Sequence, residues 1–184
     1  MRFSVLVFIF IAVVGAIAVG WIYESRSKTT TVRPELEIPT DIDYFLAELK
    51  YRIFNQAGSL DYQLRSPYLE HFARDDISRV KQPVVDVYRP GGDWRVKASR
   101  GEIFHQKNRL QLNDNVVMQK FGPKPMQVRS QSMLFEPDRN RLSSEETVVI
   151  ESGNARISGN NAVFDLQNEI YLLKNTRSVY YHDS

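Results

Sequence analysis

The chain of 184 residues contains no cysteine. Disulfide bonds, thiolate metal sites and cysteine nucleophiles are therefore excluded. An excess of charge of one sign is also missing, because 24 lysines and arginines are mixed with 22 aspartates and glutamates, for a net charge of +2. A protein that binds nucleic acid without sequence preference carries a concentrated basic stripe, so this class is excluded as well.

The sequence also lacks a recognisable catalytic or metal-binding constellation. His71, His105 and His182 lie in unrelated segments, without the spacing of metal ligands. The paired carboxylates Asp75-Asp76 and Glu145-Glu146 are typical of turns, since adjacent strand residues point to opposite faces. The Gly-Gly and Ser-Gly steps lack the strand and helix context of a phosphate-binding loop. We therefore expect no enzyme, no metal and no cofactor.

One long apolar run is present, from Phe3 to Tyr23, and it contains no charge. At about 1.5 Å of rise per residue, a helix of this length crosses a hydrocarbon core of ~30 Å. A cleaved signal peptide is the alternative, because Ala16-Ile17-Ala18 resembles a cleavage site, but the apolar run continues beyond it. We expect a transmembrane anchor over residues 1–24. Charge alone leaves the side of the membrane undecided.

The segment 25–39 is polar and contains Pro34 and Pro39, so we expect a linker there. From residue 40 to residue 184, short runs alternate apolar and polar residues between turn clusters such as Arg89–Asp93 and Gly122–Pro125. This pattern predicts antiparallel hairpins with one apolar face. Residues 41–55 fit a helix or a strand, and we interpret them as a strand.

A repeat underlies the hairpins. A shift of 32 residues carries Leu64 to Val96 and then to Val128, and a further shift of 29 leads to Ile157. The same shifts connect Ser66, Ala98, Ser130 and Gly159. About four copies of one hairpin unit would stack into a continuous apolar interior. An ordinary β-sandwich with coincidental spacing is the alternative.

Alternation also predicts which side chains face the interior. They form either a sealed core or the lining of an open groove, and the sequence leaves both possibilities open. The predicted inward residues are Tyr62, Leu64, Val85, Val87, Trp94, Val96, Leu110, Leu112, Val116, Met118, Phe135, Phe164, Ile170 and Leu172.

The order of short motifs along the chain resembles the LptC family, the membrane-anchored periplasmic subunit of the lipopolysaccharide export system of Gram-negative bacteria. The motifs are Asn55-x-x-Gly58-x-x-x-Tyr62-x-Leu64, His71-Phe72, Gln82-Pro83-Val84, Trp94-x-Val96-x-Ala98, Leu110-x-Leu112-x-x-x-Val116 and Ile157-Ser158-Gly159. The resemblance extends over nearly the whole chain. Residues 40–45 depart from the Pro-Asp-Tyr-Tyr that the family usually has there, which leaves the register of the first strand open.

This resemblance implies an all-β fold, a twisted open β-jellyroll of repeated antiparallel hairpins preceded by one N-terminal transmembrane helix. It implies a single-pass protein of the inner membrane with its soluble domain in the periplasm. There it would bind lipopolysaccharide through the lipid A acyl chains. It would receive this lipid from the LptF/LptG-type subunits of an ABC transporter, with their ATPase behind them, and pass it to an LptA-type bridge protein. A membrane-tethered scaffold that binds proteins only is the alternative.

The family pattern also implies site residues. The expected lipid contacts by position are Leu49, Val80, Ile170 and Tyr180, in addition to the inward residues above. The expected partner edges are the strand from Tyr44 to Phe54, including Tyr51, Ile53 and Phe54, and the C-terminal residues Ser178, Val179, Tyr180 and Tyr181. Gly58 and Gly159 would form backbone turns that support docking.

Overall fold

The structure is a computed structural model that describes residues 42–181. The predicted anchor (1–24) and linker (25–39) lie outside these residues. Within the described range, no helix has the length and apolar character that a membrane span requires.

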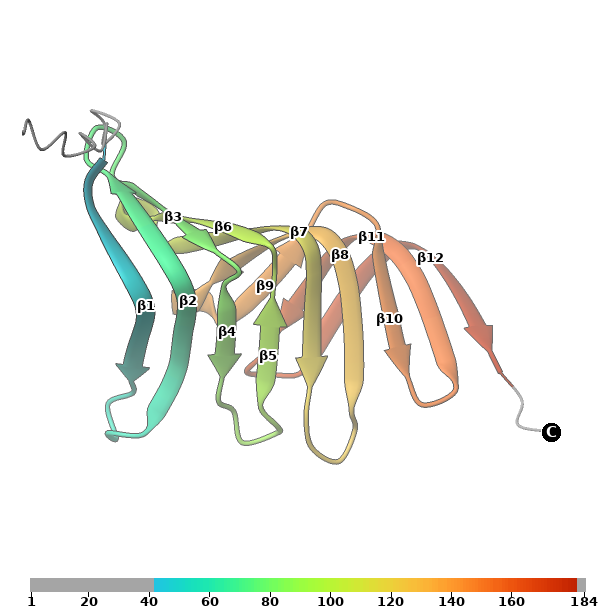
Figure 1. The fold of residues 1–184 in the computed structure, drawn as a ribbon. Helices are drawn as coiled ribbons and strands as arrows, with labels where there is room; N and C mark the ends of the chain where they lie inside the picture. The colour runs from blue at the N-terminus through green and yellow to red at the C-terminus, as the bar shows by residue number, and fades with distance from the viewer. Residues whose placement is uncertain (1–41, 182–184) are drawn as a thin grey trace, which may run out of the picture. The chain divides into compact units, whose positions relative to one another are not determined.

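The described residues form one twelve-stranded antiparallel sheet that folds over on itself (Figure 1). The strands are β1 (Ile42–Phe54), β2 (Leu60–Phe72), β3 (Ile77–Lys81), β4 (Val84–Val87), β5 (Trp94–Lys97), β6 (Arg100–Phe104), β7 (Arg109–Lys120), β8 (Met126–Glu136), β9 (Arg141–Ser144), β10 (Val148–Ser152), β11 (Ala155–Asp165) and β12 (Ile170–Tyr180), with short 3-10 helices η1 (His105–Lys107) and η2 (Pro137–Arg139). The predicted all-β jellyroll of antiparallel hairpins is therefore confirmed, and residues 42–54 are a strand as expected.

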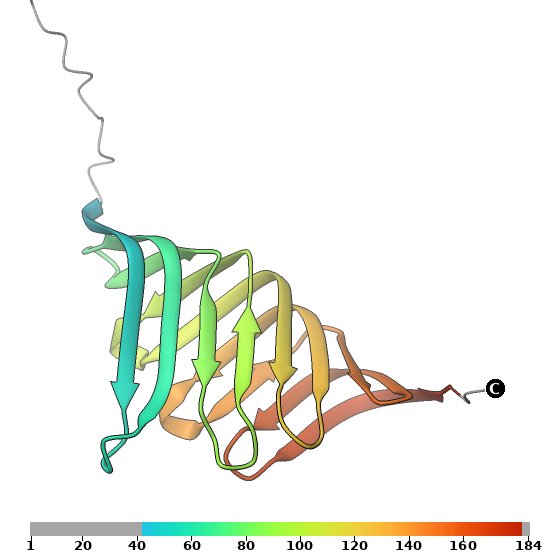
Figure 2. The same cartoon turned by 60° about the horizontal axis from the view of Figure 1, so that its bottom comes forward.

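Long strands cross from one layer to the other, and short strands come in pairs (Figure 2). The first half of β2 pairs with β4 and its second half pairs with β3. In the same way β7 pairs with β6 and then with β5. Two consecutive short strands, such as β3 and β4, thus correspond to one long strand that is interrupted where the sheet bends from one layer to the other. The two layers face each other with their apolar sides.

At the bend, a strand must change the face that it turns inward. In β2, Leu64 and Ser66 are buried before the bend, and Leu69 and His71 are buried after it, so the alternation slips between positions 66 and 69. Other long strands place a residue with positive φ near the bend, such as Asn161 in β11. A left-handed residue is a local break in the pleat that allows the strand to turn.

The residues that the 32-residue repeat aligned at Ser66, Ala98, Ser130 and Gly159 line this bend. All are small and buried. The Ser66 hydroxyl lies 2.6 Å from the Lys81 carbonyl, just before the break between β3 and β4. The Ser130 hydroxyl donates to the Thr147 carbonyl, 3.1 Å away, at the break between β9 and β10. The serines therefore satisfy carbonyl groups that the interrupted strands leave unpaired.

Gly58 and Gly159 differ in role. Gly58 has φ +79° and lies in the turn between β1 and β2, as predicted. The expectation of a turn at Gly159 is wrong, because this residue lies inside β11. A Cβ atom there would come within 2.7 Å of the Lys174 carbonyl oxygen, so the position needs glycine for the close approach of β12.

Twelve of the fourteen predicted inward residues face the interior, and eleven of them are buried, with Tyr62 partly so. The prediction is wrong for Ile170 and Leu172, which are 54% and 61% exposed. On β12, Tyr171 pairs with the buried Phe164 across the strands and therefore shares its inner face. Tyr171 and Leu173 pack against the core in place of the two predicted residues.

Candidate functional site

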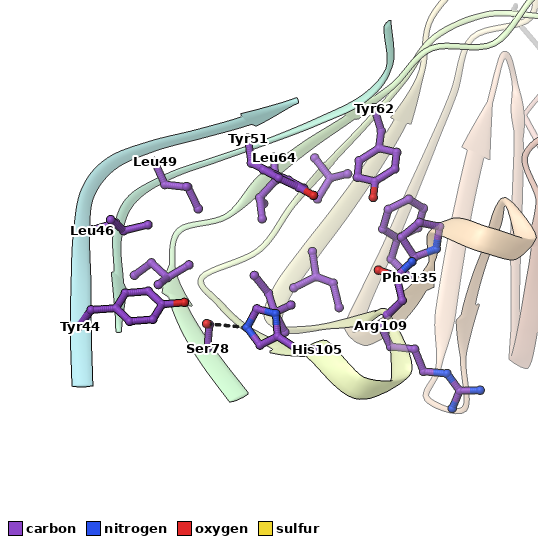
Figure 3. A pocket seen from close by; sticks show the side chains of 16 residues that line it. Tyr44, Leu46, Leu49, Tyr51, Tyr62, Leu64, Ser78, His105, Arg109 and Phe135 are labelled. Atoms are coloured by element: carbon purple, nitrogen blue, oxygen red, sulfur yellow. Dashed lines mark hydrogen bonds between the residues drawn. The ribbon is translucent and has the colours of Figure 1, made fainter. Parts of the chain in front are cut away.

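A cavity of about 330 Å³ lies between the two layers at the end of the sheet that β1 forms (Figure 3). Most of its walls are aliphatic or aromatic. The lining residues are Tyr44, Leu46, Leu49, Tyr51, Tyr62, Leu64, Leu69, Ser78, Val85, Ile103, His105, Asn108, Arg109, Leu110, Phe135 and Pro137. This volume is at the lower end of the range for ligand pockets.

The β1 side of the cavity is open because β1 is the last described strand of its sheet. Tyr44 and Leu46 point into the cavity from the first half of β1, and Leu49 and Tyr51 from the second half (Figure 3). Leu46 is 43% exposed and Tyr51 is 51% exposed. Across the cavity, the Phe135 ring meets the Tyr62 ring edge to face, with centroids 5.9 Å apart.

Beyond the cavity, the interior is sealed. Trp94, Val96, Leu112, Val116 and Phe164 are at most 1% exposed and pack into one apolar cluster. A single open groove therefore does not run through the whole domain. The inward side chains form a sealed core in the middle and line an open cavity at the β1 end.

The predicted lipid contacts divide accordingly. Leu49, Tyr62, Leu64, Val85, Leu110 and Phe135 line the cavity. Val80, Val87, Trp94, Val96, Leu112, Val116 and Phe164 belong to the sealed core. Ile170 and Tyr180 are exposed on β12. Tyr180 nevertheless pairs with Ala155, and Ala155 lies on the same face of β11 as Ile157, which packs against the core. The Tyr180 side chain therefore lies on the inner face of β12 although it is exposed.

The Tyr62 side chain lines the cavity and is partly buried against the core. Burial, together with the smaller effects of the nearby Tyr51, Asp138 and Asp61, raises the pKa of the Tyr62 phenol to about 12. The phenol is therefore neutral under physiological conditions. Among the described residues that line the cavity there is no aspartate, glutamate or lysine, and Arg109 is the one arginine.

The rim of the cavity is basic. Arg109 lies 3.0 Å and Arg139 lies 3.3 Å from the buried Glu136 carboxylate, and Arg141 donates a 2.8 Å hydrogen bond to it. Burial alone would raise the pKa of Glu136, but the three guanidinium groups lower it below its ordinary value. Three cations with the Glu136 carboxylate and the nearby Asp138 carboxylate leave a net charge of +1 beside the apolar cavity. This arrangement suits an amphiphile with an apolar chain and an anionic head.

Two terminal strands have edges that no described strand covers, since β1 pairs only with β2 and β12 only with β11. Such edges accept a further strand by main-chain hydrogen bonds. The predicted partner residues Tyr51, Phe54, Ser178, Val179, Tyr180 and Tyr181 are exposed, Ile53 is partly buried, and Gly58 lies in an exposed turn. Gly159 is buried and does not offer a surface to a partner.

Sequence reasoning missed one cluster. His71 and His105 were expected in unrelated units, but the pairing of β3 with both β2 and β6 brings them together with Asp76. A signal for this existed. The two histidines occupy similar places in successive hairpins, 34 residues apart against a repeat of 32, and hairpin ends of stacked units lie side by side.

Comparisons with known proteins agree with this architecture. A family model described as "Lipopolysaccharide-assembly, LptC-related" matches residues 6–181. The lipopolysaccharide export system protein LptC of Haemophilus influenzae is 20% identical over 197 residues, which cover 96% of this chain and 94% of that protein. The crystal structure of LptH of Pseudomonas aeruginosa, an LptA-homologous periplasmic component of the lipopolysaccharide transport device, is similar in fold, with a TM-score of 0.53. It is 10% identical, and the match covers 66% of this chain and 95% of LptH. Because the family model spans most of the sequence, the chain belongs to the LptC family.

Proposed function

We propose that this chain binds lipopolysaccharide through its lipid A acyl chains and passes it from an inner-membrane ABC transporter to an LptA-type periplasmic protein. Membership of the LptC family and the fold it shares with LptH support a role in lipopolysaccharide transport. LptC is a transport component, which supports a function without catalysis. The observation that carries the finer proposal is the apolar cavity that opens along β1.

The physical reason is the cost of exposing lipid tails to water. Each CH₂ group that leaves water stabilises the bound state by about 0.8 kcal/mol, so part of one acyl chain in the cavity gives substantial affinity. The basic rim at Arg109, Arg139 and Arg141 supports an orientation in which the anionic part of lipid A stays outside the cavity. Passing the lipid onward requires moderate affinity, because a very tight site would retain it.

The two uncovered edges support a place between two partners. We assign the β1 edge to the LptF/LptG-type transporter side and the β12 edge to the LptA-type bridge protein, with residues 1–24 as a single-pass inner-membrane anchor and the β domain in the periplasm. Strand addition at both ends would extend one sheet through several proteins.

This assignment predicts different effects at the two ends. Val179→Pro, or removal of residues 178–184, should weaken binding of the bridge protein. The deletion removes part of the β12 edge, and proline at 179 removes a ladder hydrogen bond that holds this edge strand to β11. Association with the transporter should remain, which co-purification of both partners with the variant measures. Loss of both partners together would contradict the assignment of the ends.

A scaffold that binds only proteins is the second candidate, and the sealed interior around Trp94 and Leu112 favours it. Neighbouring positions on β1 discriminate between the two. Leu46→Asp places a carboxylate in the cavity, whereas Phe45→Asp places it at a residue that does not line the cavity. Burying an unpaired charge against acyl chains is costly, so Leu46→Asp should weaken binding of fluorescent lipopolysaccharide to the full-length chain in detergent by roughly tenfold or more.

Phe45→Asp is the matched control and should bind lipopolysaccharide as the wild-type chain does. If neither substitution changes binding, or if the wild-type chain binds no lipopolysaccharide at all, the scaffold is favoured and the lipid site is withdrawn.

A further inference from the structure

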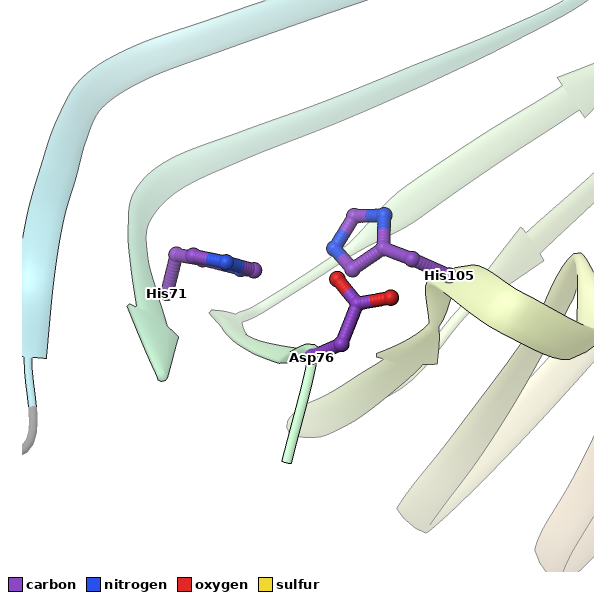
Figure 4. Close-up of side chains that lie close together, drawn as sticks. All are labelled: His71, Asp76 and His105. Atoms are coloured by element: carbon purple, nitrogen blue, oxygen red, sulfur yellow. The ribbon is translucent and has the colours of Figure 1, made fainter. Parts of the chain in front are cut away.

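Three side chains with metal-ligating atoms converge on one another (Figure 4), and one of them, His105, lines the cavity. His71 comes from the end of β2, Asp76 from the turn between β2 and β3, and His105 from η1. One ligand atom from each residue lies within 4.8 Å of the other two. The proposed lipid function does not require this arrangement, although His105 also lines the cavity.

We propose that His71, Asp76 and His105 bind a divalent transition-metal ion, with Zn²⁺ as the ion best matched to the donors. Two imidazole nitrogens and one carboxylate oxygen are a donor set typical of zinc sites that keep one position open. In a tetrahedral site with bonds of about 2.0–2.1 Å, ligand atoms lie roughly 3.3 Å apart, so atoms now within 4.8 Å of one another must approach by up to about 1.5 Å around the ion.

The two imidazole rings are already held toward a common point. The fully buried Ser78 hydroxyl lies 3.1 Å from His71 Nδ1 and 2.8 Å from His105 Nε2, and an ion bound by these two nitrogens would replace both hydrogen bonds. With Nδ1 turned to this point, His71 Nε2 lies 3.9 Å from the Asp43 carboxylate. A carboxylate near the outer nitrogen is a common partner of metal-bound histidine. The Tyr44 ring stacks on His71 with centroids 4.6 Å apart and limits its rotation.

Asp76 and His105 are accessible from solvent, so an ion can reach the site through them. His105 is exposed and Asp76 is partly exposed, whereas His71 is buried. One carboxylate and two neutral imidazoles leave a net charge of about +1 on the site when a divalent ion is bound. Because Ser78 and His105 also line the cavity, the open coordination position lies beside it. The ion would tie the β2–β3 hairpin to η1 at the end of the molecule where the interior is open.

Neighbouring aspartates offer a matched test. Asp76→Asn removes the charged ligand, and asparagine tolerates the φ of 50° at this position. The backbone groups of Asp76 keep their hydrogen bonds to Ala73 and His105. Asp75→Asn makes the same chemical change at an exposed residue outside the cluster. His105→Gln changes a second ligand at an exposed position.

The experiment is a calorimetric titration of the metal-free full-length chain in detergent with ZnCl₂, followed by Co²⁺ substitution and its visible spectrum. We expect one ion per wild-type or Asp75→Asn chain, with a higher melting temperature and a Co²⁺ spectrum of a nitrogen–oxygen site. Asp76→Asn and His105→Gln should each raise the dissociation constant by at least roughly tenfold. The proposal is overturned if the wild-type chain shows no saturable binding of one ion, or if these two variants bind Zn²⁺ as tightly as Asp75→Asn does.

Discussion

The β1 end and the middle of the domain have the same alternating pattern but different interiors. In the middle, Val96, Leu112 and Met118 are fully buried between strands on both sides. On β1, Leu46 and Tyr51 also point inward, yet they remain about half exposed because no described strand lies beyond them. An apolar residue that points inward is thus part of the core where its strand lies between two other strands. Where its strand is at the edge of the sheet, the same kind of residue forms an accessible apolar wall.

This difference separates stability from binding. The fully buried cluster removes apolar area from water, and such burial is the main stabilising contribution to folding. The β1 wall supplies apolar surface that a ligand can still cover. Substitutions in the two regions should therefore change different measured quantities.

The largest expected effect distinguishes the regions with the same substitution. Leu112→Ala removes a fully buried side chain and should lower the free energy of unfolding by about 2–5 kcal/mol. Leu46→Ala removes a side chain that is 43% exposed and should lower it by under about 1 kcal/mol. Urea denaturation of the full-length variants measures both. Equal losses would show that the β1 end is packed like the middle.

The next effect compares two glycines that the sequence could not tell apart. Gly159→Ala forces a Cβ against the Lys174 carbonyl and should destabilise the domain by about 1–3 kcal/mol, mainly by displacing β12. Gly58→Ala meets no atom within 4 Å, so it should lose only about 1 kcal/mol for its positive φ. Thermal unfolding measures the order of the two losses, and the reverse order would be inconsistent with the close approach at Gly159.

A pH-dependent effect tests the basic rim. The pKa of Glu136 is lowered in the folded state, so its stabilising contribution is present above the unfolded value of about 4.5 and is lost as the pH falls through the lower folded value. Glu136→Gln should therefore lower the free energy of unfolding by about 1–2 kcal/mol at pH 7. The difference from wild type should shrink below about pH 4.

The exposed Glu145 provides the control for this substitution. Glu145→Gln should leave stability within about 0.5 kcal/mol of wild type at every pH, which denaturation curves at several pH values check. A Glu136→Gln loss that is the same at acid and neutral pH would show that the ion pairs do not supply it.

The smallest expected effect concerns the two β12 residues that were predicted to point inward but are exposed. Ile170→Thr and Leu172→Thr replace side chains that point outward, and both should stay within about 0.5 kcal/mol of the wild-type stability in urea. A loss of more than about 2 kcal/mol for either would restore the inward placement that alternation predicted.

Much of the fold could be predicted because alternation and the repeat are local signals. They located the inward rows at Leu64, Val96 and Val128, and the small residues aligned with Ser66 that form the bend. The register of β12 could not be predicted, because each bend changes the face that points inward and the shift between repeat copies falls from 32 to 29 residues in the last copy. The inner face therefore passed from Ile170 to Tyr171.

The site was less predictable for a different reason. Whether Leu49 or Leu112 borders open space depends on whether its strand has a neighbour on one side or on both. The sequence of a single strand does not contain this information. The meeting of His71 with His105 depends on the pairing of β3 with β6, which is a contact between different hairpins. Only the repeat, which places both histidines at similar hairpin ends, carried information about it.

The most direct test places a photo-crosslinking residue on either side of the sheet and measures lipopolysaccharide adducts in membranes containing the transporter and ATP. The probe at Leu49 faces the cavity, and the probe at Ile170 is exposed on the outer face. Adducts at Leu49 that increase with ATP, with few at Ile170, are the result we expect. Equal adducts at both positions, or none at Leu49 in a folded protein, would contradict lipid binding in the cavity.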